Sequence, residues 1–491
     1  MATCEIALQE LDLPAYDVPE HLLEVWTRLI NHCEEIMAEN EKLQKEIEKL
    51  KVKLAKFQKQ SAKPDIKPNR NNESENDSFT KKRKSLGESA ESSEKALRNE
   101  RIKIDREVVL RLDGNDRPDD FHSTGFRDVV VQDIALKTDT VKYRLERGYS
   151  ASTGKFYEAA LPEGVEPGYG TDLQALVLMY YFQLRVPEPK IHQLLTSQGI
   201  VISTGQISEI ITKKHLKMLE REREEVLWAG LWATTFQQID DTGMRVNGVN
   251  HYVTTLCSPY YSCFFTRRHK NAITIEGLIC NEMADPESTL DDYVWILLGD
   301  DAGQFHNQTT YRGLCWIHEE RHYGKLRPFF KSHQKLVDDF RGEIWDFYFE
   351  LKAYKECPTK QEKEHLSKRF GELFDRTTGY EELDHRIRLT YAKKEHLLLV
   401  LEFPELPLDN NESERTLREW VIKRRISGGT RSKAGTKAWD VTLSLCDTAR
   451  KLGQNFYFYL VDRISGRNTL PSLADQIFEQ SGVERPESAT A

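Results

Sequence analysis

The sequence predicts a mixed α/β protein of several domains, and three features support this prediction. The chain has 491 residues, which is long for a single domain. Short β-prone runs alternate with turns between residues 236 and 298, whereas the flanking regions show helical periodicity. A heptad pattern near the N-terminus adds a long helix to this α/β body.

Composition and charge limit the classes of function. Charged residues make up 30% of the chain, the net charge is −9 and the pI is near 6.0, so binding of nucleic acid would require local clusters of basic residues. The eight cysteines are scattered without any C-x-x-C pair, which indicates free thiols in a reducing compartment. Because the sequence shows neither a long apolar run nor a signal-peptide pattern, we expect a cytoplasmic protein without membrane contact.

Residues 20–60 carry an apolar repeat that predicts a coiled-coil dimerisation helix. Two series of positions recur every seven residues and are offset by three. They are Trp26, Cys33, Asn40, Ile47 and Leu54, and Leu29, Ile36, Leu43, Leu50 and Phe57. The polar Asn40 favours two parallel helices in a fixed register. The alternative is a single amphipathic helix docked on its own chain.

Two segments of different composition follow. Residues 61–100 are rich in Pro, Asn, Ser and charge, and they predict a disordered linker. Residues 101–168 predict a small β-rich module whose role is not evident from the sequence. Its strands are expected near Val129–Val131, Lys142–Arg144 and Lys155–Tyr157.

Residues 169–228 predict a helical region that is a candidate for DNA binding. Helices are expected over Ala175–Phe182, Lys190–Ser197 and Ser203–Lys214. Two short helices around a turn at Gly199 are compatible with a helix-turn-helix, which would present Lys213 and Lys214 to DNA. The alternative is a helical hairpin that serves only packing.

The segment from residue 229 onward predicts a sheet. Strands are expected over Phe236–Asp240, His251–Cys257 and Ser262–Thr266, then a helix near Ile273–Cys280 and a fourth strand over Val294–Leu298. The short connections between the first three strands indicate an antiparallel meander. Three strands, a helix and a further strand are the layout of a ribonuclease-H-like core.

Paired aspartates end the first and fourth of these strands. Asp240-Asp241 and Asp300-Asp301 are each followed by a glycine turn. Carboxylates at the C-terminal ends of neighbouring strands can converge on one site. Together with a helical glutamate, Glu414, they would supply the oxygen ligands for two hard cations.

Glu414 belongs to the stretch Leu406–Arg418, which predicts the start of a helix. Asp409 and Asn410 are good N-cap residues, and Glu414 and Arg418 share a helix face. The alternative for this stretch alone is a capped, salt-bridged surface helix. The long segment before it, about 311–405, is too long for a loop and predicts a helical insertion within a catalytic domain spanning 229–465. Residues 466–491 are expected to form a C-terminal tail.

Four motifs occur in a fixed order along this region. They are Asp240-Asp241-Thr242, Gly299-Asp300-Asp301-Ala302-Gly303-Gln304-Phe305, Leu314-Cys315-Trp316-Ile317-His318-Glu319-Glu320-Arg321, and Asp409-Asn410-Asn411-Glu412-Ser413-Glu414-Arg415. With the coiled coil they closely resemble transposases of the bacterial insertion-sequence family sixty-six, over about residues 20–465.

The resemblance implies a ribonuclease-H-like domain with an Asp-Asp-Glu triad that uses Mg²⁺ (or Mn²⁺), as two ions, to cut and join DNA at transposon ends. It assigns Asp240, Asp300 and Glu414 as catalytic and metal-binding residues, with Asp241 and Asp301 as register alternatives. Many members of that family carry a cysteine-rich zinc segment, but residues 100–165 here contain no cysteine. Cys315 and His318 offer only two ligands, so we do not expect zinc.

The implied partners are double-stranded DNA, comprising transposon ends and target, and a second copy of the chain through the coiled coil, with accessory proteins as a further possibility. The bacterial cytoplasm and nucleoid would be the location. The expected DNA contacts are Asn411, Arg415, Arg418, Lys423, Arg424, Arg425, Arg431, Lys433, Lys213 and Lys214. Two other classes stay open: a catalytically silent DNA-binding or regulatory protein with the same fold, and a structural coiled-coil scaffold.

Overall fold

The computed structural model describes residues 20–57, isolated positions between 104 and 131, and residues 138–485 except 163–164, 272–293, 295 and 307. The fold is mixed α/β, as predicted, with a five-stranded and a two-stranded sheet. The chain divides into two compact units, one formed by residues 1–40 and 140–491 and one by residues 41–139. The predicted linker over 61–100 and the predicted helix near 273–280 lie outside the described residues.

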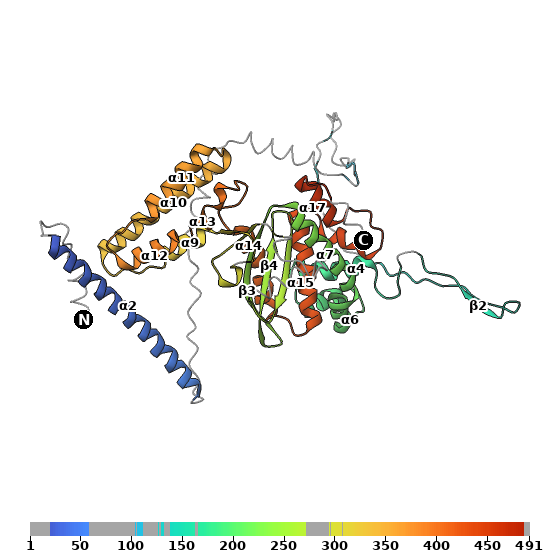
Figure 1. Cartoon of the computed structure of the whole chain (residues 1–491). Helices are drawn as coiled ribbons and strands as arrows, with labels where there is room; N and C mark the ends of the chain where they lie inside the picture. Colours follow the sequence, from blue (N-terminus) through green and yellow to red (C-terminus); the bar gives the residue numbers. More distant parts are fainter. Residues whose placement is uncertain are drawn as a thin grey trace, which may run out of the picture. The chain divides into compact units, whose positions relative to one another are not determined.

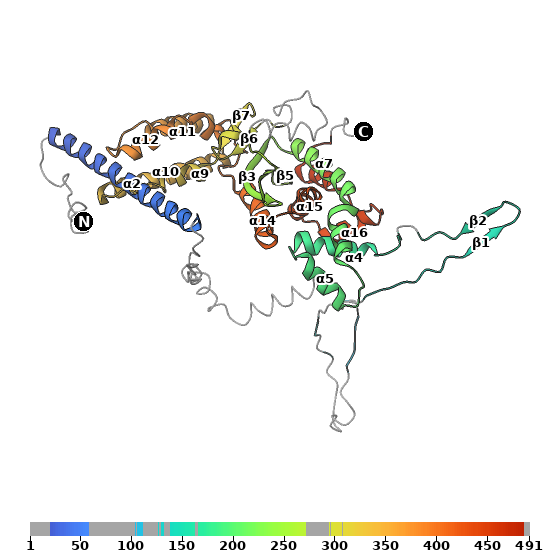
Figure 2. The same ribbon diagram turned by 90° about the horizontal axis from the view of Figure 1, so that it is seen from below.

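The central sheet has the strand order β5-β4-β3-β6-β7. The predicted antiparallel meander is confirmed as β3 (Phe236–Val246), β4 (Val249–Cys257) and β5 (Ser262–Arg267). Figure 1 labels β3 and β4, and Figure 2 labels β5. β6 (Ile296–Gly299) and β7 (Tyr311–Leu314) continue the sheet in parallel with β3. The prediction that the helical insertion begins at residue 311 was therefore wrong, because residues 311–314 form the edge strand.

Helix α15 (Lys433–Lys451) covers the opposite edge of the sheet. Its side chains recur every four residues along one face and accept hydrogen bonds from alternate N–H groups of β5. The Thr266 N–H donates to Asp440 at 2.9 Å, and the Phe264 N–H donates to Ser444 at 2.9 Å. The Ser262 N–H donates to Thr448 at 3.1 Å. The N–H groups on the open side of edge strand β5 thereby find hydrogen-bond acceptors on a helix.

The helical region before the sheet contains the predicted helix pair. Its elements are α4 (Thr171–Leu178), η3 (Met179–Gln183), α5 (Glu188–Ser197), α6 (Thr204–Glu209), η4 (Ile210–Lys214) and α7 (Leu216–Ala233), and Figure 2 shows α4, α5 and α7. Ser203 caps α6 in a capping box with Gln206. The predicted second helix is interrupted, because its last turn is the π-helix η4.

The insertion is an α-helical subdomain with its own hydrophobic core. Its helices are α9 (Trp316–Tyr323), α10 (Lys331–Glu356), α11 (Lys360–Phe374), α12 (Glu381–Tyr391), α13 (Lys394–Leu397) and η7 (Leu399–Leu401), of which α10 and α11 lie side by side (Figure 1). Trp316, Phe347 and Phe370 are fully buried among them. Burying several large aromatic side chains gives this segment a core separate from that of the sheet.

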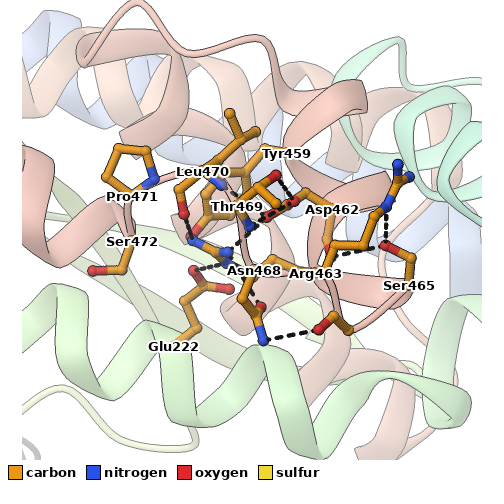
Figure 3. Close-up of polar contacts among 12 residues, drawn as sticks. Glu222, Tyr459, Asp462, Arg463, Ser465, Asn468, Thr469, Leu470, Pro471 and Ser472 are labelled. Carbon is orange, nitrogen blue, oxygen red and sulfur yellow. Dashed lines mark hydrogen bonds and ion pairs between the residues drawn. The ribbon is translucent and has the colours of Figure 1, made fainter. Parts of the chain in front are cut away.

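The C-terminal part of the chain packs on α7. α16 (Phe456–Ile464) is followed by α17 (Leu473–Ser481), so much of the predicted tail over 466–491 is a folded helix. Arg463 connects the two regions: its guanidinium lies 3.2 Å from a Glu222 oxygen on α7 and 2.8 Å from an Asp462 oxygen, and it donates to the Leu470 carbonyl at 2.9 Å (Figure 3).

The N-terminal helix α2 (Glu20–Phe57) shows features of both predicted alternatives. Glu34 is buried, accepts hydrogen bonds from the N–H groups of Phe329 and Phe330, and lies 3.0 Å from His333. This face is docked on the insertion. On another face, six positions of the predicted coiled-coil series are exposed, namely Leu29, Ile36, Asn40, Leu43, Ile47 and Leu50.

In the described part of residues 101–168, the predicted β-rich module contains a hairpin of β1 (Arg147–Ser150) and β2 (Lys155–Glu158). The prediction of strands at Val129–Val131 and Lys142–Arg144 was wrong, because neither segment has a strand partner in the described residues. No described helix is both long and apolar enough to cross a membrane.

Candidate active site

The first two predicted acids lie at the same edge of the sheet. β3 and β6 run parallel, and their last paired residues are Gln238 and Leu298. Asp240 and Asp300 each follow two residues after this last pair, so both segments place an acid at the same height along the sheet. The prediction that Asp240 ends its strand before a glycine turn was wrong, because β3 continues through Asp240 and Gly243 to Val246 by pairing with β4. Asp240 and Asp300 nevertheless lie just beyond the parallel pairing of β3 with β6, on the side where α/β sheets bind ligands.

Asp240 lies in a field of negative charge. Burial raises the pKa of its carboxyl to about 7, and the charges of Asp300, Asp241 and Glu414 add to this effect. One hydrogen bond lowers the pKa of Asp240: the Asp241 N–H donates to its carboxylate at 2.7 Å. Within the described part of the chain, neither Asp240 nor Asp300 forms an ion pair with a cationic side chain.

The two register alternatives differ from these acids because each is paired with a cation. Asp241 lies 3.2 Å from the Lys270 ammonium. Asp301 contacts Arg312 at 2.5 Å and Lys393 at 2.6 Å. Burial would raise the pKa of Asp301, but these two partners outweigh burial and lower it to about 2. The aspartates left without a cationic partner are therefore Asp240 and Asp300.

Helix α14 (Asn411–Ser427) brings the third acid to this edge. Asn410 occupies the N-cap position, but its buried side chain does not cap the helix and instead donates to the Ile239 carbonyl at 2.9 Å. The Asn410 N–H donates to Cys315 Sγ at 3.3 Å, and Asp409 accepts from the Asn411 N–H at 3.1 Å. The helix start is thus fixed to Ile239 within β3 and to Cys315, the residue directly after β7.

Glu414 lies one turn into α14 and faces helix α9. Its Oε1 atom is 3.2 Å from Arg321 Nη1 and 3.5 Å from His318 Nε2. The side chain is 24% exposed. Burial lowers the pKa of His318, although the Glu414 charge acts in the opposite direction.

The donor chemistry of the three acids fits a hard divalent cation. No three His, Cys, Asp or Glu side chains of the described ranges are close enough together to form a complete metal site. Mg²⁺ needs few protein ligands because it retains several waters, and it prefers carboxylate oxygens. A cation would also relieve the repulsion that raises the pKa of Asp240.

One predicted DNA contact is excluded by burial. Lys423 has no exposed surface, its Nζ atom lies 3.5 Å from the centre of the Tyr181 ring, and it donates to the Tyr181 carbonyl at 2.5 Å. Burial lowers the pKa of Lys423 to about 7. The prediction that Lys423 contacts DNA was therefore wrong, because its side chain packs on Tyr181 and does not reach solvent. Lys423 follows Trp420 by three residues and shares the buried face of α14 with it.

The remaining predicted contacts differ in accessibility. Asn411 and Arg424 are half-buried, whereas Arg415, Arg418, Arg425, Arg431, Lys433, Lys213 and Lys214 are exposed. Lys214 pairs with Glu166 at 3.2 Å. Arg424 Nη1 lies 3.4 Å from the hydroxyl of Thr242, two residues beyond Asp240.

A groove of about 520 Å³ continues from these arginines and includes a residue that the sequence did not single out. It is lined by Arg245, Arg424 and Arg425 among others. The Arg245 carbonyl accepts from the Thr430 N–H at 3.3 Å. A Cβ at Gly429, whose φ is +94°, would lie 2.4 Å from that carbonyl. The Gly428-Gly429 pair was therefore the signal in the sequence for this close approach.

The structure is thus a mixed α/β protein in which acids from two neighbouring parallel strands lie where sheets of this class bind ligands. The family model described as "Transposase IS66 family" matches residues 168–438, more than half of the chain, and the protein belongs to this family. A region of 169 residues is 41% identical to "Uncharacterized protein y4jO" of Sinorhizobium fredii. The match covers 34% of this chain and 52% of that protein, so the chain spans about half the length of the curated relative.

Proposed function

We propose that the protein is a DNA transposase that cleaves DNA at insertion-sequence ends and transfers the cut strand to a target. The proposed catalytic domain is ribonuclease-H-like, and Asp240, Asp300 and Glu414 are its metal-binding residues. The observation that carries this proposal is the pair Asp240 and Asp300, which have no cationic partner among the described residues and lie near Glu414, in a chain that belongs to a transposase family. Mg²⁺ or Mn²⁺ is the proposed cofactor, as two ions.

Each acid has a role in this proposal. Bound divalent ions would activate the attacking oxygen and stabilise the leaving oxygen. Asp240, at the centre of the negative field, is the proposed shared ligand, with Asp300 and Glu414 on either side. The anchor of Asn410 on the Ile239 carbonyl holds the helix of Glu414 against the strand of Asp240.

The exposed arginines beyond Glu414 are the proposed DNA track. Arg415, Arg418 and Arg425 lie along α14, and Arg431 and Lys433 follow at the start of α15. Contacts of this kind position the phosphate backbone and weaken as salt rises. The helix pair α5–α6, with Lys213 in η4, is a second proposed DNA contact.

The exposed face of α2 supports self-association. Leu29, Ile36, Leu43 and Leu50 recur every seven residues and are exposed in one copy of the chain. An apolar stripe with this period fits the same stripe on a second parallel helix. We therefore propose a homodimer or a higher assembly of dimers as the active form, in the bacterial cytoplasm and on the nucleoid, with accessory proteins as possible further partners.

Strand cleavage tests the proposal. A labelled duplex that carries the element's own ends is incubated with the full chain in Mg²⁺ and in EDTA. We expect Mg²⁺-dependent nicking at the ends, with a loss of at least about a thousandfold for Asp240→Asn, because several kcal/mol of transition-state stabilisation disappear. Tight binding of the duplex without cleavage would instead identify a catalytically silent DNA-binding protein.

A further inference from the structure

A second cleft lies on the other side of Asp300, between the sheet edge and the insertion. Its volume is about 400 Å³. Asp300 and Leu314 line its sheet side, and His318, Arg321 and Lys325 line its helical side. The insertion thus contributes directly to the surroundings of the acids and does not serve only as a spacer between strand β7 and helix α14.

Most of the charge in this cleft is already neutralised within the protein. Asp301 is paired with Arg312 and Lys393. Glu319 is buried and paired with Arg386 and with Lys393, the latter at 3.1 Å. These cations are committed to buried carboxylates, and moving them would leave those carboxylates without partners.

Arg321 and Lys325 are not committed in this way. The Arg321 side chain is 48% exposed, and its ion pair with Glu414 at 3.2 Å is partly open to solvent. Such a pair contributes little stability and is readily broken. Lys325 is exposed and forms no ion pair with any residue in the part of the chain that the structure describes.

We propose that this cleft is a phosphate-binding site for the DNA strand that lies at the acids, and that Arg321 exchanges Glu414 for a DNA phosphate when that strand binds. The inference rests on the proposed function in taking DNA as the ligand. Arg321 is then a positioning residue: it holds the Glu414 carboxylate in the free protein and the phosphate in the complex, and Lys325 adds a second phosphate contact.

The chemistry of the site favours a phosphate over other anions. A guanidinium presents parallel N–H donors that match the oxygens of a phosphodiester. The cleft opens next to Asp300, so a strand whose reacting phosphate lies at the acids would place a neighbouring phosphate in the cleft. Loss of the Arg321 contact would leave Glu414 free for a divalent cation.

Binding in EDTA tests the site without any cleavage. The probe is a fluorescent duplex of the element's end, titrated with full-length protein across a salt series. For Arg321→Ala we expect affinity to fall about tenfold and the salt slope to decrease by about 1, as for loss of one charged phosphate contact. Arg376→Ala is the matched control, because Arg376 is an exposed insertion arginine paired with Glu343 at 2.7 Å and does not line the cleft.

A double-mutant cycle distinguishes exchange from a general effect of charge. Glu414→Gln releases Arg321, so we expect this variant to bind the duplex more tightly than the wild type in EDTA. In the Arg321→Ala background the same substitution should give a much smaller gain, because no arginine is released. Circular dichroism and thermal unfolding establish that each variant is folded, and Arg321→Lys replaces Arg321→Ala if that variant is not.

Two results would overturn the inference. One is an equal loss of affinity in Arg321→Ala and Arg376→Ala, which would show only a long-range effect of charge. The other is an equal gain from Glu414→Gln in both backgrounds. A wild type that fails to cleave DNA but shows the expected cycle would contradict the proposed function and leave the phosphate site intact, so the two failures are distinguishable.

Discussion

Two buried polar regions of this protein contain acids with similarly raised pKa values but opposite surroundings. At the sheet edge, burial and like charges raise the pKa of Asp240 to about 7, and no described cation pairs with it. In the C-terminal network, burial raises the pKa of Glu222 to about 7, but Arg463 lies 3.2 Å away (Figure 3). A raised pKa alone therefore does not mark a functional site.

The partners of each acid make the difference. Arg463 also pairs with Asp462, whose carboxylate accepts the Thr469 N–H at 2.9 Å, so the network is closed by protein groups. Asp240 lacks such a partner among the described residues, and the charges of Asp300, Asp241 and Glu414 oppose its ionisation. Buried charge without a partner is costly, and its presence in a folded chain suggests a role for a ligand that is absent from the protein itself.

The largest expected effect on stability comes from removing Arg463, the cation that pairs with Glu222 and Asp462. Arg463→Ala leaves Glu222 and Asp462 buried without their cation, so we expect the free energy of unfolding to fall by about 3–5 kcal/mol. Urea unfolding of the full chain measures this. Arg467→Ala, on an exposed side chain nearby, should change stability by less than about 0.5 kcal/mol. A comparable loss in both variants would contradict the role given to the network.

At Asp240 we expect a substitution to increase the free energy of unfolding and not to decrease it. Because the folded pKa of Asp240 is raised from 3.8 to about 7, its ionisation destabilises the fold as pH rises through this range. Asp240→Asn removes this effect. We expect the free energy of unfolding of Asp240→Asn, measured relative to the wild type, to rise by about 1–3 kcal/mol as the pH increases from 5 to 8. A difference that is the same at both pH values would show that Asp240 is already compensated.

Asp301 should behave as a structural acid. Its folded pKa is lowered to about 2, so its ion pairs stabilise the protein above the ordinary pKa of 3.8, and this stability is lost as pH falls towards 2. We expect Asp301→Asn to lower stability at pH 7 by about 1–2 kcal/mol, discounted for partial exposure. Mg²⁺-dependent cleavage by the folded variant should persist, and its abolition would reverse the choice between Asp300 and Asp301.

The smallest expected effect concerns the exposed basic residues. Arg425→Ala should weaken DNA binding by about threefold to tenfold and reduce the salt slope by about 1, without affecting stability. Fluorescence anisotropy across a salt series measures both quantities. Lys368→Ala is the control, because the Lys368 side chain on α11 is 80% exposed and pairs with the neighbouring Glu372. Equal effects of both substitutions would remove Arg425 from the DNA track.

The sequence was sufficient for the parts of the fold that depend on local pattern. Strands β3, β4 and β5 were predicted because β-prone runs are separated by short turns. β7 was missed because four residues carry too little periodicity to be distinguished from the adjoining helices. α17 was missed because its burial depends on packing against α7.

The same distinction applies to the candidate site. Motif order indicated the two aspartate pairs, but the member of each pair that lacks a cation depends on contacts with distant residues, such as Lys270 for Asp241 and Lys393 for Asp301. The burial of Lys423 depends on Tyr181, which lies far away in the sequence. Such tertiary contacts are not encoded in spacing along the chain.

Thermal unfolding with and without Mn²⁺ at pH 8 tests most directly whether the three acids form a cation site. A ligand that binds only the folded state raises Tm. We expect Mn²⁺ to raise the Tm of the wild type and of Asp301→Asn by about 2 °C or more, and to leave Asp240→Asn unchanged. An equal rise in all three proteins would contradict the account, because the cation would then bind elsewhere.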